Sequence, residues 1–167
     1  MRAVFQRVSS ARVEVEGRVV AEIGAGLCVL VGVMAGDGAQ DCDYMCRKIL
    51  NLRMWPNEKT GRAWDQSVSQ KGYEVLLVSQ FTLYGQPKGN KLDFHVAMPP
   101  QEARPFYEAF VQRVQHAYRP ERVKDGIFGA MMEVHIANSG PVTLFLDSRK
   151  PPGNGGEGAV GGGSESS

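Results

Sequence analysis

A buried strand turns polar within the stretch Val78-Ser79-Gln80-Phe81-Thr82-Leu83-Tyr84-Gly85. The apolar run before it begins at Tyr73 and is typical of a strand with both faces buried, so we expect a strand over residues 73–83. Hydroxyl and amide groups placed near a core need hydrogen-bond partners, and a substrate is one such partner. A strand end closed by ordinary turn-forming residues explains the same pattern.

Further strands are predicted on both sides of this stretch. Val13 and Val15 alternate with charged residues, which indicates a half-buried strand, and Glu16-Gly17 is a hairpin-turn signal. Residues 27–33 form a nearly continuous apolar run, as in a strand buried on both faces. The predicted strands cover residues 3–8, 11–16, 18–23, 27–33, 131–136 and 142–146.

Two helices are expected. Asp41 can cap a helix that runs to about Leu52, and Pro99-Pro100 can open a second helix, because proline is tolerated in a first turn. The first helix has its apolar stripe at Tyr44, Met45, Ile49 and Leu52, and the second at Ala103, Phe106, Tyr107, Phe110, Val111 and Val114. Residues 86–92, with one proline, one glycine and two lysines, are expected to form a loop.

Composition limits the possible classes of protein. The chain has 167 residues, which suits one domain, and 43% of them are hydrophobic. A net charge of +1 argues against a protein that coats nucleic acid by bulk charge, although it allows a local basic patch. Three cysteines without a CxxC pair give no disulfide framework and suit the cytoplasm. We expect no signal peptide and no membrane span, and a disordered Gly/Ser-rich tail over residues 149–167.

Several kinds of catalytic site receive little support. His95, His116 and His135 are far apart in sequence, so no metal site or cofactor is predicted. Thr82 or Ser79 could act as a nucleophile with His95 as the base, but no GxSxG motif accompanies them. The phosphate-binding GxxxxGK[ST] motif and a strand-linked GxGxxG are both missing from the sequence.

A second informative segment reads Asn138-Ser139-Gly140-Pro141-Val142-Thr143. An ordinary hairpin turn between two strands explains its Gly-Pro pair, since such pairs are common in turns. The other interpretation is a cis peptide bond that directs two carbonyl oxygens the same way. Only about 5% of X-Pro bonds are cis, so the sequence leaves both interpretations open.

Together these two segments resemble the D-aminoacyl-tRNA deacylases, in the branch of bacteria and eukaryotes that carries SQFT. The resemblance covers residues 1 to about 148. Further matching segments follow in family order: Met1-Arg2-Ala3-Val4, Gln6-Arg7-Val8, Arg47-Lys48-Ile49-Leu50-Asn51-Leu52-Arg53, Lys88-Gly89-Asn90-Lys91, Asp93-Phe94-His95, Lys124-Asp125-Gly126 and Phe128-Gly129.

The resemblance implies an α+β fold with a compact antiparallel β-barrel-like core, helices packed outside, and a homodimer. Its deacylase domain would span residues 1–148. Ser79, Gln80, Phe81 and Thr82 would line the pocket for the 3′-terminal adenosine of tRNA and its aminoacyl ester. Gly140 and Pro141 would form a Gly-cisPro motif inserted into the pocket of the other subunit, with Arg7 holding its orientation. Phe128 and Met132 would line the pocket wall.

The implied reaction is hydrolysis of D-aminoacyl-tRNA to free amino acid and tRNA. The family uses the 2′-OH of the terminal ribose to assist, which suits a chain without a nucleophilic triad. Main-chain N–H groups near Phe81 and Thr82 are our candidate oxyanion donors, and Thr82 as a covalent nucleophile is the alternative. Carbonyl oxygens of Gly140 and Pro141 would exclude L side chains by steric clash, whereas glycine would enter.

Two other functions fit the sequence less well. A non-catalytic nucleic-acid-binding module of the replication-associated kind would be expected to carry a strongly basic face or tail. A general esterase for small esters of D-amino acids would not need the tRNA. Candidate phosphate contacts for a tRNA are Arg47, Lys48, Arg53, Lys88 and Lys91.

Overall fold

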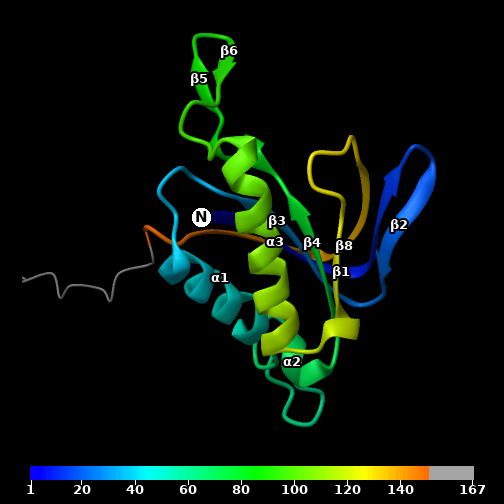
Figure 1. Ribbon diagram of the computed structural model, residues 1–167. Helices are drawn as coiled ribbons and strands as arrows, with labels where there is room; N and C mark the ends of the chain where they lie inside the picture. Colours follow the sequence, from blue (N-terminus) through cyan, green and yellow to red (C-terminus); the bar gives the residue numbers. More distant parts are fainter. Residues whose placement is uncertain (151–167) are drawn as a thin grey trace, which may run out of the picture.

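The computed structural model describes residues 1–150 and is built around one long strand, β1 (Arg2–Val15) (Figure 1). The two strands predicted over residues 3–8 and 11–16 are therefore one strand. A tight turn with left-handed Glu16 and Gly17 leads into β2 (Arg18–Ile23), as predicted.

β1 has partners along both of its edges. The pairs Ala11–Ile23 and Val8–Gly26 belong to one constant antiparallel register, so β2 and β3 (Gly26–Gly32) together form a single arm along one edge. The closing strand β8 (Glu133–Asp147) runs antiparallel along the other edge. β1 is consequently an inner strand of the sheet, with neighbours on both sides.

The rest of the sheet is parallel. β4 (Glu74–Ser79) pairs with β3, and β7 (Val123–Asp125) pairs with β4. Both connections cross over through helices, as parallel neighbours require. Lys124 of β7 donates to the carbonyl oxygen of Glu22 in β2 at 2.7 Å, which helps to curl the sheet towards a barrel. The predicted α+β fold with a barrel-like sheet is confirmed, with the correction that two of the strand pairings are parallel.

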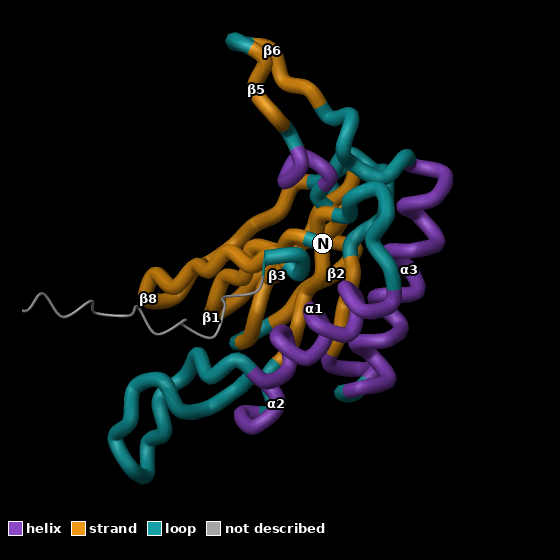
Figure 2. Tube along the Cα trace, turned by 90° about the vertical axis from the view of Figure 1, so that its left-hand side faces the viewer, coloured by secondary structure: helices purple, strands orange, loops and turns teal. Residues whose placement is uncertain are grey.

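Helices α1 (Ala39–Asn51), α2 (Val68–Lys71) and α3 (Pro100–Ala117) lie on one side of the sheet, as Figure 2 shows. α3 begins at the predicted proline pair. Asp41 is not the cap of α1: Gly38 is, and the Asp41 carboxylate accepts from the Gly38 N–H at 2.9 Å. The buried stripe of α1 also differs from the prediction, since Tyr44 and Leu52 are only half-buried. It consists of Cys42, Met45, Cys46, Ile49 and Leu50.

The main core lies between these helices and the sheet. Its largest fully buried side chains include Phe5, Leu27, Met45, Tyr107 and Phe110. All three cysteines are free, as the sequence indicated, and all three are buried. Burial raises the pKa of the Cys28 thiol to about 12, which makes this thiol unreactive at neutral pH.

The polar stretch ends its strand earlier than predicted. β4 stops at Ser79, and residues 81–84 form a short 3₁₀ helix, η1 (Phe81–Tyr84). Residues 86–92, expected to be a loop, belong to a hairpin of β5 (Gln86–Lys88) and β6 (Lys91–Asp93). A second 3₁₀ helix, η2 (Pro120–Arg122), precedes β7.

The two ends of the described chain meet at Asp37. Its carboxylate lies 2.9 Å from the Met1 ammonium group and 3.0 Å from Arg149 Nε. Arg149 therefore packs on the folded domain, although the tail was predicted to begin there. The rest of the predicted disordered tail, residues 151–167, lies outside the described residues. Within residues 1–150, no helix is long and apolar enough to cross a membrane.

Substituting Gly26 should test the parallel pairing of β3 and β4. A Cβ atom at Gly26 would lie 1.8 Å from the carbonyl oxygen of Glu74, a contact that only backbone movement can relieve. We expect Gly26→Ala to lower the free energy of unfolding by about 3 kcal/mol or more, measured by urea denaturation. Gly24→Ala is the matched control, because its Cβ would meet Glu74 Oε1 at 3.7 Å. Equal stability of the two variants would contradict this assignment.

Candidate active site

A cavity of about 670 Å³ opens where β4 ends. Ser79, Gln80 and Phe81 form part of one wall, and Phe128 and Met132 form part of another. The cavity therefore brings together five of the predicted site residues from two distant parts of the chain. The lining is largely apolar, with further contributions from Phe94, Met98 and Met131.

The wall formed by β4 turns sharply after the last hydrogen bond of the ladder. The Gln80 N–H donates to the Val31 carbonyl oxygen at 2.8 Å, and the chain then coils into η1. The first N–H groups of such a helix have no acceptor within it. Those of Phe81 and Thr82 also donate to no other described residue. Phe81 lines the cavity, whereas Thr82, also predicted to do so, is not among its lining residues. The role of these two N–H groups as oxyanion donors stays a prediction.

The side chains of η1 are arranged around these donors. Gln80 Nε2 hydrogen-bonds to Thr82 Oγ1, so each of these two polar side chains fixes the other. The Phe81 ring is 56% exposed and packs edge-on against Phe94, with ring centroids 5.0 Å apart. Phe81 is a large apolar side chain left accessible at the cavity, which is typical of a ligand-binding surface.

Arg2 contacts η1 and holds it in place, and it was not among the predicted site residues. Its Nη1 donates to the Leu83 carbonyl oxygen at 2.9 Å, and its guanidinium lies 4.4 Å from the centre of the Tyr84 ring. Its Nε also pairs with Asp147 at the end of β8, at 3.2 Å. The only sequence signal for Arg2 was its place in the matching N-terminal segment.

The opposite wall is held by a partly buried polar pair. The Tyr107 hydroxyl donates to Asp125 Oδ1 at 2.6 Å, and the Gly126 N–H donates to the Leu77 carbonyl oxygen at 3.1 Å. Desolvation raises the pKa of both the Asp125 carboxyl and the Tyr107 hydroxyl. These bonds fix the segment that leads to Phe128, whose ring packs against Tyr107.

Gly140 and Pro141 do not line the cavity of their own chain. They belong to a bulge in β8: Gln6 pairs with Thr143 and Val8 with Asn138, so residues 139–142 all oppose Arg7. The predicted hairpin turn is therefore wrong, because both flanks of the segment pair with β1 and not with each other. The Gly140–Pro141 peptide bond is cis, and both residues are exposed.

Arg7 holds this bulge in place. Its Nε donates to the Ser139 carbonyl oxygen at 3.3 Å, and its Nη1 donates to that of Met54 at 2.7 Å. The Asn138 amide donates to the carbonyl oxygens of Arg7 and Val142, both at 3.0 Å. The bulge is thus tied to β1 by side chains on both strands and presents Gly140-Pro141 outward.

A cluster outside the cavity contains potential metal ligands: Glu14, Glu133 and His135. Arg12 Nη2 lies 3.3 Å from His135 Nδ1, and because arginine can only donate, that nitrogen must accept. The ring proton then occupies Nε2, which faces Glu14 at 3.4 Å. A metal at this cluster would need the Nε2 lone pair, so we interpret the cluster as a polar network around the Arg12–Glu14 ion pair. The absence of a metal cofactor stays a prediction.

Comparison with known proteins identifies the family. A family model described as D-Tyr-tRNA(Tyr) deacylase matches residues 4–147. A D-aminoacyl-tRNA deacylase from Dictyostelium discoideum is 51% identical over 90% of this chain and 99% of its own length. The chain belongs to the D-aminoacyl-tRNA deacylase family. The predicted resemblance and enzyme class are confirmed.

Other members of the D-aminoacyl-tRNA deacylase family agree in sequence and fold. The human D-aminoacyl-tRNA deacylase 1 is 51% identical over 90% of this chain and 72% of its own length. A solved structure entitled c-Myc DNA Unwinding Element Binding Protein has a TM-score of 0.84 and 51% identity, over 88% of this chain and 98% of that one. A probable eukaryotic D-amino acid tRNA deacylase shares the fold at 19% identity, with a TM-score of 0.74 over 87% and 97% of the two chains.

Substituting Gly32 should displace η1, which begins at the cavity wall, without disrupting the sheet. A Cβ atom there would lie 3.0 Å from both the Gln80 carbonyl oxygen and Leu83 Cβ. We expect Gly32→Ala to shift the amide resonances of residues 80–83 and to cost about 1 kcal/mol of stability. Gly38→Ala, where a Cβ would meet nothing within 4 Å, should leave those resonances unchanged. Unshifted resonances in Gly32→Ala would show that Gly32 does not position η1.

Proposed function

We propose that this protein hydrolyses the ester bond of D-aminoacyl-tRNA and of mischarged glycyl-tRNA, and that it leaves L-aminoacyl-tRNA intact. The product pair would be the free amino acid and tRNA, as in chirality proofreading during translation. The observation that carries this proposal is the cavity at the end of β4, where unpaired N–H groups adjoin an aromatic wall. The cytoplasm remains the predicted compartment, and residues 1–148 the predicted catalytic domain.

The cavity suits a nucleoside that carries an amino acid. Its volume of about 670 Å³ is within the range of small-molecule pockets. Phe81, Phe94 and Phe128 offer ring faces or edges to an adenine base, which stacks on aromatic side chains. Ser79 and Gln80 supply polar groups at the rim. We therefore place the 3′-terminal adenosine and its aminoacyl ester here.

The proposed reaction needs no protein nucleophile. Water attacks the ester carbonyl carbon, the carbonyl oxygen becomes an oxyanion, and the ribose oxygen leaves with a proton. The Phe81 and Thr82 N–H groups would donate to the oxyanion, while the neighbouring ribose hydroxyl orients the water or the proton. In the described residues, Thr82 Oγ1 bonds to Gln80 and His95 Nδ1 bonds to Asp93, with no hydrogen bond between Thr82 and His95. This pattern supports assistance by the RNA over a triad.

Selectivity for the D configuration would come from a second subunit. Gly140 and Pro141 are exposed on a bulge that Arg7 holds, and they lie outside their own cavity. A homodimer would insert this rigid backbone segment into the cavity of the partner. A backbone wall cannot change rotamer to admit an L side chain, and glycine has no side chain to exclude.

Deacylation of three charged tRNAs tests this function. We expect D-Tyr-tRNA and Gly-tRNA to be hydrolysed and L-Tyr-tRNA to be spared by at least about 100-fold, because a steric clash of about 3 kcal/mol gives that ratio. The measurement is release of labelled amino acid under single-turnover conditions. Comparable cleavage of D- and L-Tyr-tRNA would refute the backbone-wall argument.

Replacing the Thr82 hydroxyl separates the two catalytic mechanisms. If main-chain donors and the ribose hydroxyl do the chemistry, Thr82→Ala keeps most of its single-turnover rate on D-Tyr-tRNA, within about tenfold. D-Tyr-tRNA that ends in 2′-deoxyadenosine should then react far more slowly with the wild-type enzyme. Loss of nearly all activity in Thr82→Ala, with substrate still bound, would instead favour a covalent mechanism.

One observation favours a second candidate function. The solved structure at 51% identity bears a title that describes binding to a DNA unwinding element. A binding module of that kind would retain duplex DNA and hydrolyse no aminoacyl-tRNA. A small-ester hydrolase, the third alternative, would cleave D-tyrosine methyl ester as well as D-Tyr-tRNA, so the same assay with these two substrates separates all three functions.

A further inference from the structure

The β5–β6 hairpin stands apart from the body of the protein. Figure 1 shows it projecting from one end, and none of its residues is buried. It forms its own two-stranded sheet, since β5 pairs only with β6. A hairpin that contributes no core residue contributes little to folding stability, so its conformation calls for another explanation.

The charges on this hairpin oppose its stability. Lys88 and Lys91 are paired directly across the two strands, next to the left-handed turn residue Gly89. Like charges in directly opposed positions are destabilising. One acidic residue, Asp93, relieves the repulsion partly, at 3.3 Å from the Lys88 ammonium group. A polyanion bound between the two lysines would relieve it fully.

Asp93 is fixed as an anion at the base of the hairpin. Its hydrogen bonds to His95, from the ring and from the main chain, and its contact with Lys88 lower the carboxyl pKa to about 2. Asp93 therefore stays ionised throughout the neutral range and orients Lys88 on one side and the His95 ring on the other. Both of these side chains are more than half exposed, at 66% and 60%.

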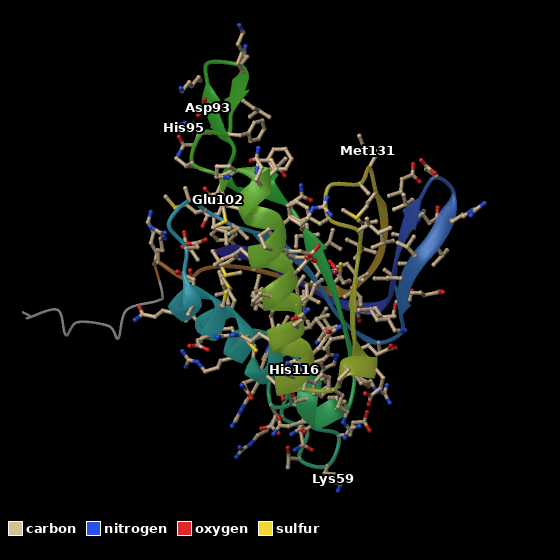
Figure 3. The ribbon with its side chains drawn as sticks, viewed as in Figure 1. Lys59, Asp93, His95, Glu102, His116 and Met131 are labelled. Carbon is tan, nitrogen blue, oxygen red and sulfur yellow. The ribbon has the colours of Figure 1, made fainter. Side chains whose placement is uncertain are left out.

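The hairpin adjoins the cavity. Phe94, the residue after β6, lines the cavity and packs edge-on against Phe81. Figure 3 shows Asp93, His95 and Met131 at the same end of the molecule, whereas Lys59 lies at the opposite end. A chain that leaves the cavity past Phe81 and Phe94 would meet the lysines of the hairpin next.

We propose that the β5–β6 hairpin is a phosphate clamp for the single-stranded RNA that precedes the aminoacylated adenosine. Lys88 and Lys91 would each contact a backbone phosphate, and exposed Leu92 would offer an apolar surface to a base. The inference rests on the proposed function, because it assumes that the terminal adenosine enters the cavity. The clamp does not include the other candidate phosphate contacts, Arg47, Lys48 and Arg53. These residues lie near the end of α1, which ends close to α2, at the opposite end of the molecule from the hairpin (Figure 1).

The test compares a substrate that has phosphates with one that has none. We expect Lys88→Ala/Lys91→Ala to lower kcat/KM on D-Tyr-tRNA by about tenfold at low salt, and to leave hydrolysis of D-tyrosyl-adenosine unchanged. Two lost phosphate contacts should also reduce the slope of log(kcat/KM) against log[KCl] by about 1.4, at about 0.7 per contact with a single strand. The melting temperature should stay the same or rise, because repulsion is removed.

Two control variants sharpen the result. Lys59→Ala removes the same charge from an exposed position far from the cavity and should change neither the rate nor the slope. Lys88→Arg/Lys91→Arg keeps both charges and should retain wild-type activity. An equal loss on both substrates would overturn the inference, as would an unchanged rate on D-Tyr-tRNA. A change in self-association of the double variant by analytical ultracentrifugation would overturn it as well, in favour of a contact between protein chains.

Failure of the proposed function can be distinguished from failure of the phosphate clamp. If the wild-type protein hydrolyses neither substrate, the function is wrong, and the clamp is tested by binding of a labelled 3′-CCA RNA oligomer alone. Weaker binding of the oligomer by Lys88→Ala/Lys91→Ala than by Lys59→Ala would still support the clamp, and equal binding would reject it.

Discussion

The pairing of β1 along both of its edges is the constraint on which the rest of the structure depends. One edge carries the arm of β2 and β3, and β3 in turn positions β4 and the cavity at its end. The other edge carries β8, whose residues 139–142 bulge opposite the single residue Arg7. β1 thereby fixes both the cavity wall and the Gly140-Pro141 segment, although they are about 60 residues apart in sequence.

Under the proposed function, this arrangement gives one chain two separate parts of a site. The cavity has binding walls and unpaired donors but no rigid element that would select a configuration. The bulge with Gly140 and Pro141 is rigid and exposed, but it does not line the cavity of its own chain. In the proposed homodimer, a second copy would join the two parts without any change of fold. The hairpin with Lys88 and Lys91 then extends the same end of the molecule towards the rest of the RNA.

The sequence predicted those features that depend on local pattern. The hairpin turn at Glu16-Gly17, the buried strand before Ser79 and helix α3 all follow from apolar periodicity and turn residues. Features set by distant partners were missed or misplaced. β8 was predicted as two strands because its continuity depends on β1. Local pattern did not single out Arg2, because its acceptor, the Leu83 carbonyl, comes from η1. The β5–β6 hairpin was missed because it buries no residue and shows no alternation of apolar and polar residues.

Mixing two variants tests the central claim, that a site is completed by the other subunit. In Gly140→Ala, the new Cβ atom would lie 2.9 Å from Arg7 Nη2 in a left-handed conformation, so the segment must shift and the variant should gain cleavage of L-Tyr-tRNA. An excess of a variant altered at Gln80, chosen by assay for loss of D-Tyr-tRNA hydrolysis, supplies an intact Gly140-Pro141 segment. If sites are shared, this addition abolishes the cleavage of L-Tyr-tRNA and preserves that of D-Tyr-tRNA. Unchanged cleavage of L-Tyr-tRNA after subunit exchange would contradict the account.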